Sequence, residues 1–347
     1  MKKESRKMSK IKIQEIEAKV VSAFIKAGVQ EADAKTVAKV LTDAQMKGIF
    51  THGYIRVPKY IDCIKAGGLI PKAELTTLVD TPSWALVDGE GGLGIAISCK
   101  ATKLAIRKAK ETGIGIVNVR GSQHFGPAGY YTAMCADEGL MGISMSNGNA
   151  IVAVTGSCEN SIGNNPFSYA VPAGKYDKII YDVAISAVSD MKVIQMAKEG
   201  KSVPDGWLID KNGVPTNNPE DYLNGGVLLP FGGYKGYGLA LMVEMFAAVL
   251  SGADTTTSVN AWNKTTDKTG NTGHIFIALD ISRMGDREEI IKRVESVLDG
   301  IKSAKLAVGA DTIYYPGEKE LINKNACLAS GEVEVFDEVI SAIEALA

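Results

Sequence analysis

Apolar residues recur at helical spacing near the start of the chain. Between residues 13 and 46 they return every three or four positions, which places them on one face of a helix, and Gly28 stands where a first helix would end. The pattern therefore predicts a pair of amphipathic helices. The positions that carry it are Ile13, Ile16, Val20, Phe24, Val37, Val40 and Leu41.

The middle of the chain changes to short apolar runs of the kind found in strands. They are separated by helical patterns, and such alternation predicts a sheet with helices packed on it. The predicted strands are 84–87, 114–119 and 141–146, and the predicted helices are 96–112 and 129–138.

The last part of the chain opens with a loop-rich crossing and is mostly helical afterwards. Residues 254–272 are polar and rich in Thr and Asn, which indicates an exposed loop. The other predicted elements are the crossing 204–230, an apolar helix at 238–250, a buried strand at 274–279, a surface helix at 287–306 and a final helix at 336–346.

Composition indicates an ordinary soluble protein. With 347 residues, 46 % of them hydrophobic, the chain can bury a large core and is expected to divide into two lobes. A formal net charge of -2 gives no overall basic field, so neither nucleic acid nor an anionic membrane is expected as a partner. Five widely spaced cysteines contain no C-x-x-C pair for zinc or thiol exchange. The start of the chain lacks the apolar segment of a signal peptide, and we expect a cytoplasmic protein.

Two of the three histidines stand in short polar, glycine-bearing frames. These are Thr51-His52-Gly53 and the segment from Ser122 through His124 to Gly126. Histidine exchanges protons near neutral pH, so both are candidates for proton transfer, although a lone histidine beside glycine is more often a hydrogen-bonded turn residue. Arg56 follows the first frame, and its planar guanidinium suits a carboxylate. An acidic substrate is therefore expected.

A glycine motif at residues 89–94 fits G-x-G-x-x-G, the dinucleotide fingerprint. It follows a predicted strand and opens a helix, as the Rossmann motif does. The next strand, however, ends in Arg120 instead of an acidic residue that would bind the ribose, although an arginine there could favour a 2′-phosphate. No second half with matching order follows either. A simple glycine turn between strand and helix is the favoured interpretation.

A second glycine cluster, residues 230–238, places Lys235 just before a long helix. Backbone N–H groups at a helix start attract anions, so the segment could cradle a phosphate or carboxylate. It lacks the Walker pattern, and a helix start with a solvated lysine explains it equally well.

Seven ordered motifs resemble those of the malate/L-lactate dehydrogenase family, the type 2 enzymes that include ureidoglycolate, sulfolactate and 2,3-diketogulonate oxidoreductases. The resemblance covers nearly the whole chain. The matching segments are Thr51 to Arg56, Ser122 to Gly126, Gly163 to Pro166, Asp182 to Ser186, Gly206 to Thr216, Gly232 to Gly238 and Pro316 to Glu318.

The resemblance implies a mixed α/β fold unrelated to the Rossmann domain. A mixed-sheet NAD(P)-binding domain would span about 81–279, and a helical substrate portion would combine 1–80 with about 280–347. It also implies a homodimer that interconverts a 2-hydroxy acid and a 2-oxo acid with NAD or NADP, NAD being favoured. Reduction of diketogulonate, ureidoglycolate, sulfolactate or a cyclic imino acid is an alternative.

The same resemblance assigns roles to residues. His124, or else His52, would transfer the proton, with His124 favoured. Arg56 would hold the carboxylate, and Thr51 and Tyr60 would shape the substrate pocket. The cofactor would be bound by Ser146, Asn165, Asp182, Ala184, Ser186, Tyr234, Lys235, Gly317 and Glu318.

The chain departs from the family pattern at three positions. Val154 stands where proline is usual, and Asn164 and Ile185 replace threonines, which leaves substrate and cofactor specificity open. His274 is expected to be structural.

Two other classes of protein compete with this interpretation. A metal-dependent hydrolase could use His52, His124 and Asp182, but no metal-ligand spacing is present, and no metal is expected. A non-catalytic dinucleotide-binding protein is the other alternative.

Overall fold

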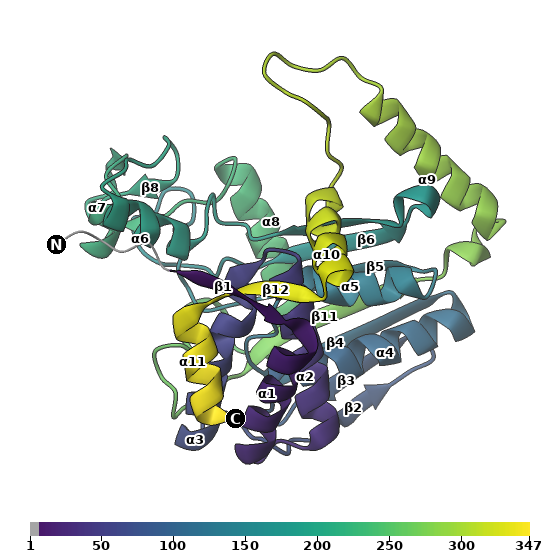
Figure 1. Ribbon diagram of the computed structural model, residues 1–347, viewed down its shortest axis with the longest axis horizontal. Coiled ribbons are helices and arrows are strands. Elements are labelled where there is room, and N and C mark those ends of the chain that lie inside the picture. The colour runs from purple at the N-terminus through teal and green to yellow at the C-terminus, as the bar shows by residue number, and fades with distance from the viewer. Residues whose placement is uncertain (1–6) are drawn as a thin grey trace.

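The computed structural model describes residues 7–347 and is built on one seven-stranded mixed sheet (Figure 1). The predicted mixed sheet with flanking helices is confirmed. Within the described residues β3 and β4 form the parallel pair of this sheet, and its other neighbours are antiparallel. The strand order is β2 (Thr76–Asp80), β3 (Trp84–Asp88), β4 (Ile114–Ser122), β11 (Thr272–Leu279), β5 (Met141–Ser146), β6 (Phe167–Pro172) and β7 (Lys178–Val183).

Both faces of the sheet are covered, which explains the apolar run of the central strand β11. Alternate side chains of a strand point to opposite faces. Phe276 belongs to the main core, whereas Ile275 packs with Met145 and Val243 on the other face. The helices α4 (Gly94–Thr112) and α5 (Ala128–Asp137) cover the first face, and α8 (Tyr234–Glu244), continued by the turn Met245–Val249, covers the second.

The two ends of the chain meet beside the sheet. β1 (Met8–Lys12) pairs with β12 (Glu332–Phe336), and Figure 1 shows these purple and yellow segments side by side. Around them lie α1 (Ile13–Lys26), α2 (Glu31–Met46), α3 (Val57–Ala66) and α11 (Asp337–Leu346). One hydrophobic core runs from these helices into the sheet. The division into two domains remains a prediction, and β2 at 76–80 pairs within the sheet.

Smaller elements surround this body. The predicted loop-rich crossing belongs to a small lobe with its own core, formed by α6 (Asp190–Glu199), α7 (Glu220–Leu223), β8 (Leu208–Ile209), β9 (Pro215–Thr216) and β10 (Val227–Leu228). Figure 1 shows α9 (Arg287–Lys302) extending away from the sheet and returning through a long loop to α10 (Glu318–Ser330).

The predicted pair of helices at 13–46 is confirmed, and residues 8–12 before it form a strand. Part of the basic segment that carries the expectation about a signal peptide, residues 1–6, lies outside the described residues. In residues 7–347 no helix combines the length and hydropathy needed to cross a bilayer.

Candidate active site

Two short 3-10 turns between α2 and α3 carry the first histidine frame. They are Phe50–His52 and Tyr54–Arg56, with Gly53 between them. The Gln45 side chain lies so close to Gly53 that a Cβ there would clash with its amide oxygen, and the same oxygen accepts from Tyr54 N at 3.1 Å. The absence of a Cβ at Gly53 allows this approach, and the Gln45 amide links α2 to the turn that carries His52 and Arg56.

The second frame lies between β4 and α5. The glycine motif 89–94 packs against it. The backbone oxygens of Gln123 and His124 press against Gly94, the first residue of α4, where a Cβ would clash with them. At Gly94 the start of α4 is therefore packed against protein backbone. This agrees with the glycine-turn interpretation of the motif.

The two frames bring their histidines face to face. The rings of His52 and His124 stack with centroids 5.4 Å apart and planes inclined by 20°. Thr51 Oγ1 lies 2.9 Å from His52 Nδ1, and Tyr60 Oη lies 2.5 Å from His124 Nδ1. Each ring is thus held at Nδ1.

Arg56 lies beside this pair with its charge free to meet a ligand. Its Nε donates to the Thr51 backbone oxygen at 2.6 Å, which orients the guanidinium. Within residues 7–347 no carboxylate forms an ion pair with Arg56, so its two terminal nitrogens can bind an incoming carboxylate through parallel bonds.

The histidines are neutral in this environment. Burial, and then the charge of Arg56, lower the pKa of His52 to about 3. The same two causes, with smaller contributions from the other two histidines, hold the pKa of His124 well below its usual range. Burial raises the pKa of the Tyr60 phenol, so Tyr60 keeps its proton. A neutral imidazole can accept a proton from a hydroxyl group.

Trp262 is part of this cluster, although little in the sequence points to it. Its ring stacks on His124 at 4.8 Å and on Tyr60 at 5.2 Å, and the Arg56 guanidinium carbon lies 5.7 Å from its centroid. It comes from the loop predicted to be exposed. A single large aromatic residue in a polar loop was the only available signal.

The third histidine is structural, as expected. His274 is fully buried on β11, with Nδ1 at 2.8 Å from Ser146 Oγ and Nε2 at 2.8 Å from Ser122 Oγ. Its ring stacks on the ring of Phe125 with centroids 4.6 Å apart, and this contact helps to hold the second frame, to which Phe125 belongs, against β11. The hydroxyl of Ser146, a predicted cofactor residue, is therefore engaged with His274 and with the Asn147 backbone oxygen.

Several predicted cofactor residues lie around β7. Asp182 Oδ2 accepts from Gly129 N at 2.7 Å, at the start of α5. Asp182 is exposed as a whole residue, and the protein around its carboxyl desolvates that group only in part, which raises its pKa. Gly317 lies against Ile180 of the same strand. Glu318 instead binds Lys302 Nζ at 2.6 Å and thereby fastens the end of α9.

Asn165 has a structural position. It is fully buried, its Nδ2 donates to Ala240 O at 2.9 Å and to Glu244 Oε2 at 2.8 Å, and its Oδ1 accepts from Gly148 N. Its side chain therefore supports the surrounding loops. Ser186 forms a backbone bridge with Pro230, which brings the end of the 182–186 segment, with Ala184, next to the glycine turn before Tyr234 and Lys235. Both of these side chains are exposed.

Comparison with known proteins identifies the family. The profile of the malate/L-lactate dehydrogenase family matches residues 11–344. The chain belongs to the malate/L-lactate dehydrogenase family. It is 37% identical over 339 residues to malate dehydrogenase from Pyrococcus horikoshii, covering 94% of this chain and 92% of that one. It is 37% identical over 305 residues to L-sulfolactate dehydrogenase from Methanocaldococcus jannaschii, covering 88% and 87%.

Solved structures of the family have the same fold. Sulfolactate dehydrogenase from Methanocaldococcus jannaschii superimposes with a TM-score of 0.92 at 34% identity, covering 97% of this chain and 96% of that one. Malate dehydrogenase from Entamoeba histolytica gives a TM-score of 0.92 at 30% identity, covering 98% and 97%. As a member of this family the protein is an oxidoreductase.

Two cavities in this family member border the predicted cofactor residues. One, of about 690 Å³, is lined by Gly317 together with Lys47 and Tyr130. The other, of about 870 Å³, is lined by Gly232 and Gly233, next to the start of α8. Both volumes fall in the range typical of small-molecule sites. Within residues 7–347 no group of three or more His, Cys, Asp or Glu side chains could hold a metal ion.

Proposed function

We propose that the protein interconverts a 2-hydroxy acid and a 2-oxo acid, of the malate or lactate type, with a nicotinamide cofactor that supplies or accepts the hydride. The observation that carries the proposal is the stacked pair His52 and His124 beside Arg56, a guanidinium without a carboxylate partner in the described chain. The guanidinium can bind the carboxylate of the substrate, and a histidine can transfer a proton to or from the oxygen on the neighbouring carbon, C2.

Each residue has a role in this proposal. Arg56 binds the substrate carboxylate through its terminal nitrogens, while the bond to Thr51 keeps the guanidinium in place. In the oxidation direction the neutral His124 accepts the hydroxyl proton at Nε2, and its Nδ1–H donates to Tyr60. In the reduction direction His124 must first take up a proton at Nε2 from solvent, and it then donates this proton to the carbonyl oxygen as the hydride arrives at carbon. His52 stacks on His124 and forms a further part of the wall of the substrate position.

The first cavity suits the anionic end of the cofactor. Six lysines and four acidic residues line its wall, so its balance is positive. Lys47 and Lys324 both pair with the buried Asp43, at 2.6 Å each, which fixes their ammonium groups. We assign Gly317 and these lysines to the phosphates of NAD or NADP. The excess of lysine leaves a 2′-phosphate possible, so both cofactors belong in the test.

A homodimer in the cytoplasm is part of the proposal. Apolar side chains that a monomer would leave in water gather on α8 and the turn that follows it, which indicates a protein interface. They are Leu239, Leu241, Met245, Phe246, Val249 and Leu250. Light scattering coupled to gel filtration would give twice the chain mass for a dimer.

The test is oxidation of NADH and of NADPH, separately, with oxaloacetate, pyruvate, sulfopyruvate, oxalurate, diketogulonate and a cyclic imino acid. Turnover with a 2-oxo acid supports the proposal. Turnover with the imino acid alone would favour the imine reductase class, to which Delta(1)-pyrroline-2-carboxylate/Delta(1)-piperideine-2-carboxylate reductase of Pseudomonas putida, 29% identical, belongs. Binding of NADH without any turnover would favour a non-catalytic dinucleotide-binding protein.

A further inference from the structure

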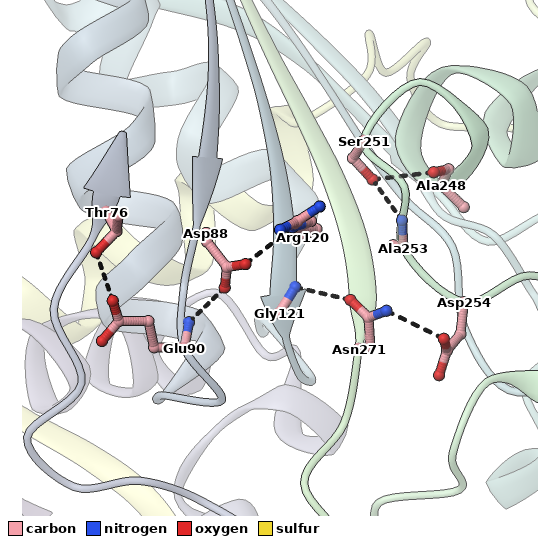
Figure 2. Close-up of polar contacts among 10 residues, drawn as sticks. All are labelled: Thr76, Asp88, Glu90, Arg120, Gly121, Ala248, Ser251, Ala253, Asp254 and Asn271. Atoms are coloured by element: carbon pink, nitrogen blue, oxygen red, sulfur yellow. Dashed lines mark hydrogen bonds and ion pairs between the residues drawn. The ribbon is translucent and has the colours of Figure 1, made fainter. Parts of the chain in front are cut away.

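The loop that carries Trp262, residues 254–271, is fastened at its base. Asp254 N donates to Asn271 O at 2.9 Å, and Asn271 Nδ2 donates back to Asp254 Oδ1 at 3.0 Å. Asn271 Oδ1 also accepts from Gly121 N at 2.8 Å. Figure 2 shows Asn271 between Gly121 on β4 and Asp254. The base of the loop is thus tied to the strand that leads directly to His124.

The far side of the loop is pressed against two glycines of the main body. A Cβ on Gly68 would clash with Thr266 O, and a Cβ on Gly91 would clash with Thr269 Cγ2. Such close approaches require the loop to follow one path. The loop is therefore held both at its base and at residues 266 and 269. The side chain that lies between these attachment points in the sequence has a fixed position.

That side chain is Trp262. Cys63 Sγ lies 3.5 Å from its backbone oxygen, and its ring covers both His124 and Tyr60 while lying near the Arg56 guanidinium. Stacked aromatic rings and a cation near an aromatic face attract each other. The indole therefore restricts both groups that would hold the substrate, the imidazole and the guanidinium.

We propose that Trp262 is a positioning and specificity residue: its indole fixes the imidazole of His124 beside the Arg56 clamp and limits the size of the substituent next to the reacting carbonyl. This inference rests on the proposed function. It implies a short-chain 2-oxo acid as substrate, because the wall beside the carboxylate clamp is the largest natural side chain.

Kinetics of two Trp262 variants separate these roles. Trp262→Ala should lower kcat for the best short 2-oxo acid by about 10–100-fold, since small displacements of reacting groups cost rates of this order. It should also raise kcat/KM for phenylpyruvate relative to pyruvate by about tenfold or more, because pocket walls discriminate by size. Trp262→Phe, which keeps a flat ring, should retain kcat within about threefold. Trp84→Phe is the matched control, since Trp84 lies on β3 and binds Asn118.

An unchanged kcat and an unchanged phenylpyruvate to pyruvate ratio in Trp262→Ala would overturn the inference. Equal losses in the Ala and Phe variants, with that ratio unchanged, would overturn it as well, because a ring would then give no rescue. If the wild-type protein turns over no 2-oxo acid at all, the proposed function fails instead.

Tryptophan emission provides a readout independent of turnover. Oxamate, a carboxylate probe of the substrate position, should change the emission of the NADH-bound protein. The change should persist in Trp84→Phe and disappear in Trp262→Phe. Persistence in Trp262→Phe would contradict the placement of Trp262 at the substrate.

Discussion

Replacement of Arg56 by alanine should weaken catalysis strongly and specifically. Arg56 is half-buried, and the bond from its Nε to Thr51 leaves the terminal nitrogens as the groups that meet the substrate. Removing one partner of a desolvated charge pair costs about 2–5 kcal/mol. At about 1.4 kcal/mol per factor of ten, this corresponds to a loss in kcat/KM of roughly 30-fold to several thousand-fold.

The same variant should change the pH dependence. Arg56 lowers the pKa of both His52 and His124, so its removal should raise both values. In the oxidation direction the base must be neutral, and the acid limb of kcat/KM should therefore move to higher pH. Burial is the larger cause of the lowered pKa of both histidines and is unchanged in the variant, so the pKa values should rise only in part.

The assay is steady-state kinetics of hydroxy acid oxidation from pH 3.5 to 9, a range that includes the lowered pKa values of the two histidines. Arg107→Ala is the matched control, because Arg107 is an exposed arginine on the neighbouring helix α4. Arg56→Lys should be intermediate, since an ammonium cannot reproduce the planar fork. A kcat/KM for Arg56→Ala within about threefold of the wild-type value, with an unmoved acid limb, would refute the assignment of Arg56 to the carboxylate.

Two further predictions concern protonation. Burial lowers the pKa of His274 to about 3, below the usual value of about 6.5, so the stability that it contributes is complete above pH 6.5 and is lost as the pH falls toward 3. Between pH 6.5 and 5 the wild-type free energy of unfolding should fall by about 2 kcal/mol more than that of His274→Asn, and parallel urea-unfolding curves would contradict this. Binding of oxalate should offset the charge of Arg56, raise the pKa of His52 and His124 and therefore take up protons in acidic solution, below pH 6. Calorimetry at pH 5.5 in cacodylate and in Bis-Tris, two buffers with different enthalpies of ionisation, should give different binding enthalpies, and equal enthalpies would count against the linkage.

Much of the fold could be predicted because its helices are strongly periodic. The buried faces of α1 and α2 are apolar at every third or fourth position. α1 ends at Lys26, just before Gly28, and α2 ends at Met46. β2 was missed for a physical reason. It is an edge strand whose residues are all exposed, so no alternation marks it. Residues 8–12 form a strand because they pair with the other end of the chain, which local pattern does not reveal.

The candidate site was partly accessible from sequence. Polar, glycine-bearing frames marked His52 and His124, but only the folded chain brings these rings, 72 positions apart, into one stack. Trp262 was hidden because the loop around it reads as solvated. Asn165 matched a motif, yet its amide nitrogen donates to Glu244 and to the Ala240 backbone oxygen. These partners lie far from Asn165 in the sequence, so a local pattern does not reveal them.

The central claim is that His124 moves the proton at the substrate position. The most direct measurement is the rate of NADH or NADPH oxidation in a single turnover, with the best 2-oxo acid, in the wild-type protein and in His124→Asn. His52→Asn is measured beside it. The account predicts that His124→Asn slows this step by roughly 10²–10⁴-fold while the Kd of the cofactor stays nearly unchanged. A wild-type rate in His124→Asn, with the loss found in His52→Asn, would contradict it.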